Sequence, residues 1–177
     1  MSLAPTVKLL SPKGTATASS GTRTTISQER YLELLEAQRP GVSVQLIAFM
    51  NELPVLNVAP EFGTNAMILR WRPTDGNSWN LGTILSNGQM RLEHMGQQAH
   101  SRGLLDQHKR YLAALAEIAG AVIKVTAKDS GWYIAKDQES TVAITVDLLV
   151  ADQTRRDQWL DAIKKFQKSV IARSQDE

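Results

Sequence analysis

Histidines are the first candidates for metal binding or acid–base catalysis in this sequence. His94, His100 and His108 lie six and eight residues apart. A zinc-binding helix of the H-E-x-x-H type needs two histidines one helical turn apart, and this spacing does not provide them. Cysteine is absent, which excludes thiolate ligands, a cysteine nucleophile and a disulfide framework. We therefore expect no metal, no cofactor and structural roles for the histidines.

The common nucleotide-binding and hydrolase motifs are also missing. The sequence has no P-loop, no G-x-G-x-x-G opening a helix, no G-x-S-x-G and no E-x-K triplet of the nuclease type. Asp147 in TVDLLVA is a possible acid or metal ligand, but alternation places it on the outward face of an extended segment. We predict no catalytic residue, although a site assembled from separated residues stays open.

Basic side chains on one face of a predicted sheet are the strongest candidates for binding. Strand alternation brings together these residues: Arg70, Arg72, Arg91, Lys124 and Lys128. The two lysines join the face only if their strand pairs with the same sheet. Guanidinium groups on a sheet can contact phosphates, but Glu93 dilutes the charge and no aromatic residue is expected there. Nucleic-acid binding, protein binding and an ordinary solvated face all remain open.

The N-terminal segment differs in composition from the rest of the chain. Residues 1–27 are rich in Ser, Thr, Gly and Ala, which predicts a flexible basic linker or tail. Residues 1–28 contribute +3 without any acidic residue, leaving −1 of the formal total of +2 for the remainder. The pI near 9.0 is therefore weak evidence for a basic binding surface. The segment is either the hinge end of a longer protein or a simple tail.

Residues 28–177 have the size and composition of a single domain. The whole chain has 177 residues, of which 42% are hydrophobic and 21% charged, as in globular proteins. No apolar run approaches the roughly 18 residues of a membrane-spanning helix. Because cysteine is absent and no signal peptide is recognisable, we expect a cytoplasmic protein that does not enter membranes.

Segments with helical periodicity lie at both ends of the predicted domain. Ser27 can cap a first helix, and a second begins after Pro40-Gly41 and stops at Pro54. A long amphipathic helix is predicted between His100 and Gly120, and apolar spacing from Trp159 onward predicts a closing helix. That closing helix has a local excess of basic residues, which is most simply a solvated face or a contact for an acidic partner.

Residues 66–95 carry the clearest pattern, a β-meander of three strands. Asp75-Gly76 and Asn87-Gly88 are the turn signals. A two-residue turn at Asn87-Gly88 pairs Leu85 with Met90 and Leu81 with His94, and buries Leu85. Residues 121–128 and 142–148 also alternate as extended segments. The predicted fold class is α+β, an antiparallel meander-based sheet with helices packed on one face.

Three stretches together resemble an uncharacterised module found at the C-termini of various prokaryotic proteins. They are WNLGTILSNGQMRLE, LAALAEIAGA and WLDAIKKF, and the resemblance extends over residues 27–173. It implies an accessory domain attached to other functions, sometimes in restriction or DNA-processing proteins, and it supplies no catalytic residue. Ile84-Leu85 stand here where the module usually has aromatic residues.

Three functional hypotheses follow. The first is a non-enzymatic accessory or interaction domain of a bacterial cytoplasmic protein, which binds a protein partner or the rest of a longer chain. The second is a nucleic-acid-binding module that uses Arg70, Arg72 and Arg91. The third is a small-molecule enzyme, which a deep pocket containing His94 or Asp147 would favour.

Overall fold

The computed structural model describes residues 24–126 and 131–175. Its helices are α1 (Gln28–Gln38), α2 (Val42–Glu52), the 3-10 helix η1 (Leu53–Leu56), α3 (Glu93–Ser101), α4 (Leu105–Ala119), α5 (Asp147–Val150) and α6 (Gln153–Gln175). Its strands are β1 (Val58–Phe62), β2 (Ala66–Trp71), β3 (Trp79–Leu85), β4 (Met90–Arg91), β5 (Val122–Val125) and β6 (Trp132–Ala135). The predicted α+β class is confirmed: β1-β2-β3-β4 form an antiparallel meander, and β5-β6 form a second sheet.

Two helices precede the sheet, as predicted. Ser27 caps α1 by accepting a hydrogen bond from a first-turn N–H at 3.2 Å, and Gly41 at φ +84° separates the two helices. Folded contacts begin before α1, because Ile26 donates its N–H to the Gly63 carbonyl at 3.0 Å and packs against the core. The rest of the predicted tail, residues 1–23, lies outside the described residues.

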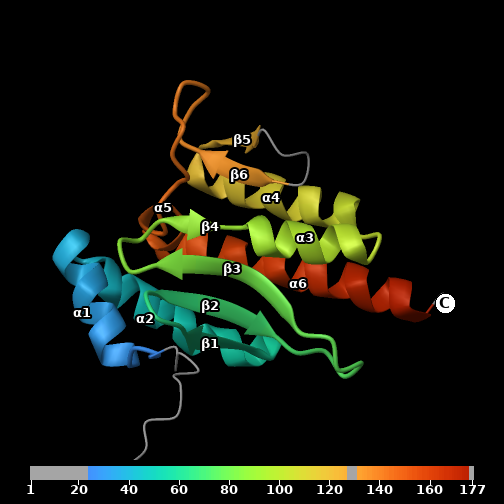
Figure 1. The fold of residues 1–177 in the computed structure, drawn as a ribbon, viewed down its shortest axis with the longest axis horizontal. Helices are drawn as coiled ribbons and strands as arrows, with labels where there is room; N and C mark the ends of the chain where they lie inside the picture. Colours follow the sequence, from blue (N-terminus) through green and yellow to red (C-terminus); the bar gives the residue numbers. More distant parts are fainter. Residues whose placement is uncertain (1–23, 127–130, 176–177) are drawn as a thin grey trace, which may run out of the picture.

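Strand β1 was not predicted, and it forms one edge of the meander (Figure 1). It pairs with β2 so that Glu61 lies opposite Ile68. Its sequence, VAPEF, contains Pro60, which has no N–H to give to a ladder. An edge strand needs partners on one side only, so the proline is tolerated, and it also hides the strand from pattern-based prediction.

The turn between β3 and β4 is one residue longer than predicted. Leu85 donates its N–H to the Gln89 carbonyl at 2.9 Å, and Gly88 donates to the Leu85 carbonyl at 2.8 Å. A three-residue loop results, with Gly88 at φ +88°, where glycine carries no Cβ penalty. The predicted pairing of Leu85 with Met90 is therefore wrong, and Ile84 pairs with Met90 instead.

A β-bulge in β3 adjusts which side chains are buried. Leu81 and Gly82 together lie opposite the single residue Leu69, because the register shifts there. A bulge changes the phase of the inward–outward alternation along a strand. Leu81 and Ile84 are both fully buried as a result, whereas Leu85, which we predicted to point inward, is only half-buried.

Helix α3 replaces the end of the predicted third strand. Strand β4 is only two residues long, and α3 begins almost immediately, so Leu81 does not pair with His94. The exposed edge of β3 is instead satisfied by one side chain of α3. The Gln98 side chain accepts the Asn80 N–H at 2.8 Å and donates to the Ser78 carbonyl at 3.0 Å. These two hydrogen bonds satisfy backbone groups that a neighbouring strand would otherwise pair.

The helix predicted between His100 and Gly120 corresponds to the last residues of α3 followed by α4. Gly120 ends α4 at φ +62°, as the sequence indicates. Gly103 lies between the two helices at φ +66°. One amphipathic pattern in the sequence therefore corresponds to two helices. The left-handed conformation at Gly103 changes the direction of the chain without interrupting the pattern of apolar residues.

The second sheet is attached to the first by residues 143–146. The Ile144 N–H donates to the Ile134 carbonyl of β6 at 2.8 Å, and the Ile144 carbonyl accepts the Met90 N–H of β4 at 2.9 Å. The prediction of an extended segment over 142–148 is correct only up to this bridge, because α5 begins at Asp147.

Helix α6 covers the inner side of the meander, while the opposite side is left without a helix in Figure 1. Phe166 of α6 makes edge-on contacts with Trp71 and Trp79 of the sheet, with ring centroids 6.5 and 5.2 Å away. Near the start of α6, Trp159 stacks on Phe49 of α2 at 4.2 Å. The predicted packing of helices on one face is confirmed for the meander by these contacts.

Tyr111 ties α4 to α6 and to the sheet inside this core. The Trp159 indole N–H donates to the Tyr111 hydroxyl at 3.0 Å, and that hydroxyl donates to the Leu81 carbonyl at 3.0 Å. Burial raises the pKa of Tyr111 well above its ordinary value. The phenol therefore stays neutral and donates a hydrogen bond to the bulged strand.

Candidate binding face

We use the name open face for the side of the meander that points away from α6. One row of side chains crosses all four strands on this side: Glu61 pairs with Ile68, Ile68 with Thr83, and Thr83 with Arg91. Directly paired residues of antiparallel strands share a face, so these four side chains point the same way. The row runs from an acidic end on β1 to a basic end on β4.

Arg70 and Arg72 lie at the acidic end of the row. Arg70 donates through Nε to one Glu61 oxygen at 3.1 Å, and Arg72 donates through Nη2 to the other. The Arg70 side chain is 20% exposed and the Arg72 side chain 64%. Because Glu61 lies on the unpredicted strand β1, sequence reasoning missed this neutralisation. Both arginines are consequently less available to phosphate than we predicted.

Arg91 lies at the basic end of the row and is exposed. It forms no ion pair with any residue that the structure describes. Beside it is a groove with a volume of about 450 Å³ between β4 and the β5–β6 sheet. Arg91, Glu93 and Gln89 line one side, and Tyr133 and Thr141 line the other.

Tyr133 is an aromatic residue on this surface that the sequence analysis did not anticipate. Its strand, β6, lies in the second sheet, and the groove brings it next to β4. Alternation within GWYIA was the available signal, because it separates Trp132 and Ile134 from Tyr133. Local patterns did not predict the bridge at residues 143–146, which brings the two sheets together.

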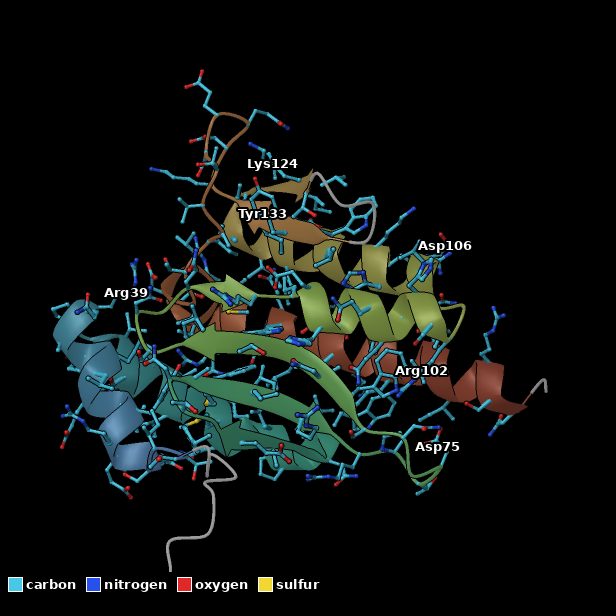
Figure 2. All side chains as sticks on the ribbon, viewed as in Figure 1. Arg39, Asp75, Arg102, Asp106, Lys124 and Tyr133 are labelled. Atoms are coloured by element: carbon cyan, nitrogen blue, oxygen red, sulfur yellow. The ribbon has the colours of Figure 1, made fainter. Side chains whose placement is uncertain are left out.

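Lys124 is the cross-strand partner of Tyr133, so the two side chains share a face of the second sheet. Figure 2 shows them close together. The Lys124 ammonium donates to the carbonyls of Gln138 at 2.9 Å and Ser140 at 2.6 Å. Its strand pairs in the two-stranded sheet, not in the meander, so it borders the predicted basic face without extending it strand by strand. Lys128 lies outside the described residues.

The candidate acid–base residues do not converge. His94 and His100 are exposed on α3, and His108 is fully buried on α4. Within residues 24–126 and 131–175, no three His, Cys, Asp or Glu side chains are grouped so that they could hold a metal ion. His94 and Asp147 are not among the residues that line the groove.

Asp147 has a structural partner. It is the first residue of α5, not part of an outward-facing strand, so that prediction is wrong. Arg39, at the end of α1, donates to the Asp147 carboxylate at 3.2 Å and to the Asn87 carbonyl at 2.9 Å. The pair therefore holds α1 and α5 against the β3–β4 turn.

Comparison with protein-family models, curated proteins and solved structures found no match for this chain. The resemblance to a prokaryotic C-terminal module therefore stays a hypothesis. In the described part of the chain, no helix combines the length and the apolar character that crossing a bilayer requires.

Proposed function

We propose that this chain is a non-enzymatic interaction domain of a bacterial cytoplasmic protein, and that it binds a partner macromolecule on the open face and in the adjoining groove. The observation that carries the proposal is that Arg91, which is exposed and forms no ion pair with a described residue, lines the same groove as Tyr133. Arginine and tyrosine are, with tryptophan, the residue types enriched among those that dominate binding energy. The bacterial and cytoplasmic assignments rest on the module resemblance and on the absence of cysteine.

The surroundings of the groove favour a macromolecule over a small metabolite. The groove continues into a sheet surface on which Ile68, Thr83 and Leu85 are half-buried. A partner can place one side chain or base in the groove and lay the rest along the strands. The volume of about 450 Å³ fits one such group.

Single-stranded nucleic acid is a second candidate, and the position of Tyr133 favours it. Proteins that bind single strands combine aromatic side chains, on which bases stack, with cations that contact the backbone. Tyr133 supplies the ring, Arg91 supplies a guanidinium group, and Lys124 adds a charge on the same side as Tyr133. Glu93 in the groove and Glu61 beyond it weaken the attraction for phosphate.

Fluorescence anisotropy of labelled single-stranded DNA, single-stranded RNA and duplex DNA at two salt concentrations tests the second candidate. Tyr133→Leu should weaken single-strand binding about tenfold through lost stacking. Arg91→Gln should lower the salt dependence by about one phosphate contact. Arg110→Gln, at an exposed position on α4, is the matched control. Absence of single-strand binding at low salt would show that this candidate is wrong.

The broader proposal has its own test. A photo-crosslinking amino acid replaces Tyr133 in the full chain, in cells, and replaces Arg110 in a control. We expect a discrete adduct of defined mass from position 133 only. Equal, diffuse labelling from both positions would contradict a binding role for the groove.

A further inference from the structure

A second site lies at the opposite end of the strands from the α1–α2 pair, where the β2–β3 loop, the α3–α4 junction and the end of α6 meet. A pocket of about 250 Å³ there is lined by residues that include Arg102, Arg173, Asn77 and Asp75. Figure 2 shows Arg102 beside the loop that carries Asp75. This pocket shares no lining residue with the groove, so it is independent of the proposed function.

Arg102 is held in place without a counter-ion among the described residues. Its guanidinium carbon lies 4.4 Å from the ring centroid of Trp79, which is almost completely buried. Nη2 lies 3.5 Å from the Ser78 carbonyl, and Nη1 is buried with no hydrogen-bond partner among the described residues. Arginine stacks well on aromatic faces, but a charged donor without an acceptor is costly. The contacts orient this guanidinium and leave it short of acceptors.

Arg173 brings a second guanidinium group to the pocket. It lies in the last turn of α6 and approaches Gly103, where an added Cβ would be 3.4 Å from Arg173 Nη2. Neither Arg102 nor Arg173 forms an ion pair within the described ranges. Attraction to the negative end of the α6 dipole explains a basic residue at this position. It does not explain why two guanidiniums share one pocket.

Among the described residues, the other features of the pocket offset only part of this positive charge. Asp75, the acidic residue of its lining, accepts the Asn77 backbone N–H at 2.9 Å and lies 3.4 Å from the Asn77 side-chain nitrogen. Leu104 also lines the pocket and is the N-cap of α4, where no described side chain caps the first N–H groups. The positive end of a helix dipole therefore adjoins the two arginines.

We propose that this pocket binds an oxyanion, the chemistry that a phosphate monoester and a carboxylate share. Planar guanidinium groups match both in geometry, through paired N–H donors. One oxyanion in the pocket would place a negative charge against both guanidinium groups and would offset the repulsion between them.

Isothermal titration calorimetry of the full chain tests the proposal, with inorganic phosphate and acetate as separate probes at ionic strength held constant by chloride. We expect one saturable site for at least one probe, and the probe that binds identifies the source of the oxyanion. Arg173→Gln should weaken binding about tenfold or more. Arg102→Met, which keeps an apolar group over Trp79, should abolish it. Arg30→Gln, on the exposed surface of α1, should leave it unchanged.

A second full-length variant tests whether carboxylates of the chain itself compete with the probes for the pocket. Asp176→Asn combined with Glu177→Gln removes the two carboxylates that follow α6 in the sequence. The proposal is overturned if neither this variant nor the unaltered chain shows saturable binding of either probe. It is equally overturned if binding survives both Arg102→Met and Arg173→Gln.

Discussion

His108 makes the stability of this protein depend on pH in a way that can be isolated. It is fully buried on α4, and neither ring nitrogen has a hydrogen-bond partner in the described part of the chain. Desolvation lowers its pKa from 6.5 to about 4. The imidazole is therefore neutral in the folded protein at neutral pH.

The sign of the effect follows from proton linkage. Below about pH 6.5 the unfolded chain binds a proton at His108, while the folded chain does not until the pH approaches about 4. The unfolding free energy is therefore unaffected by this residue above pH 6.5 and falls as the pH drops through that window. At 1.36 kcal/mol per pKa unit, the full loss is about 3 kcal/mol, with a slope of at most about 1.4 kcal/mol per pH unit.

Chemical denaturation of the unaltered chain and of His108→Met between about pH 7 and pH 4.5 measures most of this loss. The variant should be as stable or about 1 kcal/mol more stable at pH 7, because two buried nitrogens without partners are removed. Its stability should also fall less on acidification. Protonation of carboxylates whose pKa is lowered in the folded state, such as Glu29 and Glu36, destabilises both proteins equally in acid. The difference between the two curves of stability against pH therefore belongs to His108.

His94→Gln provides the matched control, because His94 is exposed. It should retain the acid dependence of the unaltered chain. Equal slopes for the unaltered chain and His108→Met would refute the reasoning, since they would show that His108 titrates normally or hydrates in the folded state.

Two further substitutions test the packing that positions the sites. Tyr111→Phe leaves the Trp159 indole and a β3 carbonyl buried without their partner, and should lower the unfolding free energy by about 2 to 4 kcal/mol in denaturant titrations; a change below 0.5 kcal/mol would show that water replaces the hydroxyl. Gly88→Ala combines a left-handed φ with a Cβ 2.6 Å from the Arg39 side chain, whereas Gly76→Ala at a similar φ meets nothing within 4 Å. Thermal unfolding should therefore rank Gly88→Ala as clearly less stable than Gly76→Ala, and equal melting temperatures would argue against the contact with Arg39.

Several elements could be predicted because their signals are local. The Ser27 cap, the break at Gly41 and the glycine at the end of α4 all act through neighbouring backbone groups. The apolar stripe of α6 was recognisable for the same reason, since Trp159 and Phe166 lie at helical spacing. Interactions within a few residues leave their pattern in the sequence itself.

The errors occurred where distant segments decide the structure. Asn87-Gly88 is compatible with a two-residue or a three-residue loop, and only the structure shows that Met90 pairs with Ile84. The bulge opposite Leu69 has no local signal either. The short third strand depends on Gln98, whose side chain satisfies the edge of β3 from another helix. These choices reflect competition among hydrogen-bond partners that are far apart along the chain.

The candidate sites show the same division. Alternation by itself placed Arg70 and Arg91 on one face of a sheet, and paired register confirms that they share it. Tertiary structure decided that Glu61 neutralises Arg70, that Tyr133 joins Arg91 across a groove, and that Arg102 stacks on Trp79 near Arg173. Within an uninterrupted strand, local periodicity determines which way a side chain points, because the backbone repeat sets it; the bulge in β3 changes that direction for Leu85. Which charges and rings it then meets is set by the packing of elements that are far apart in the sequence.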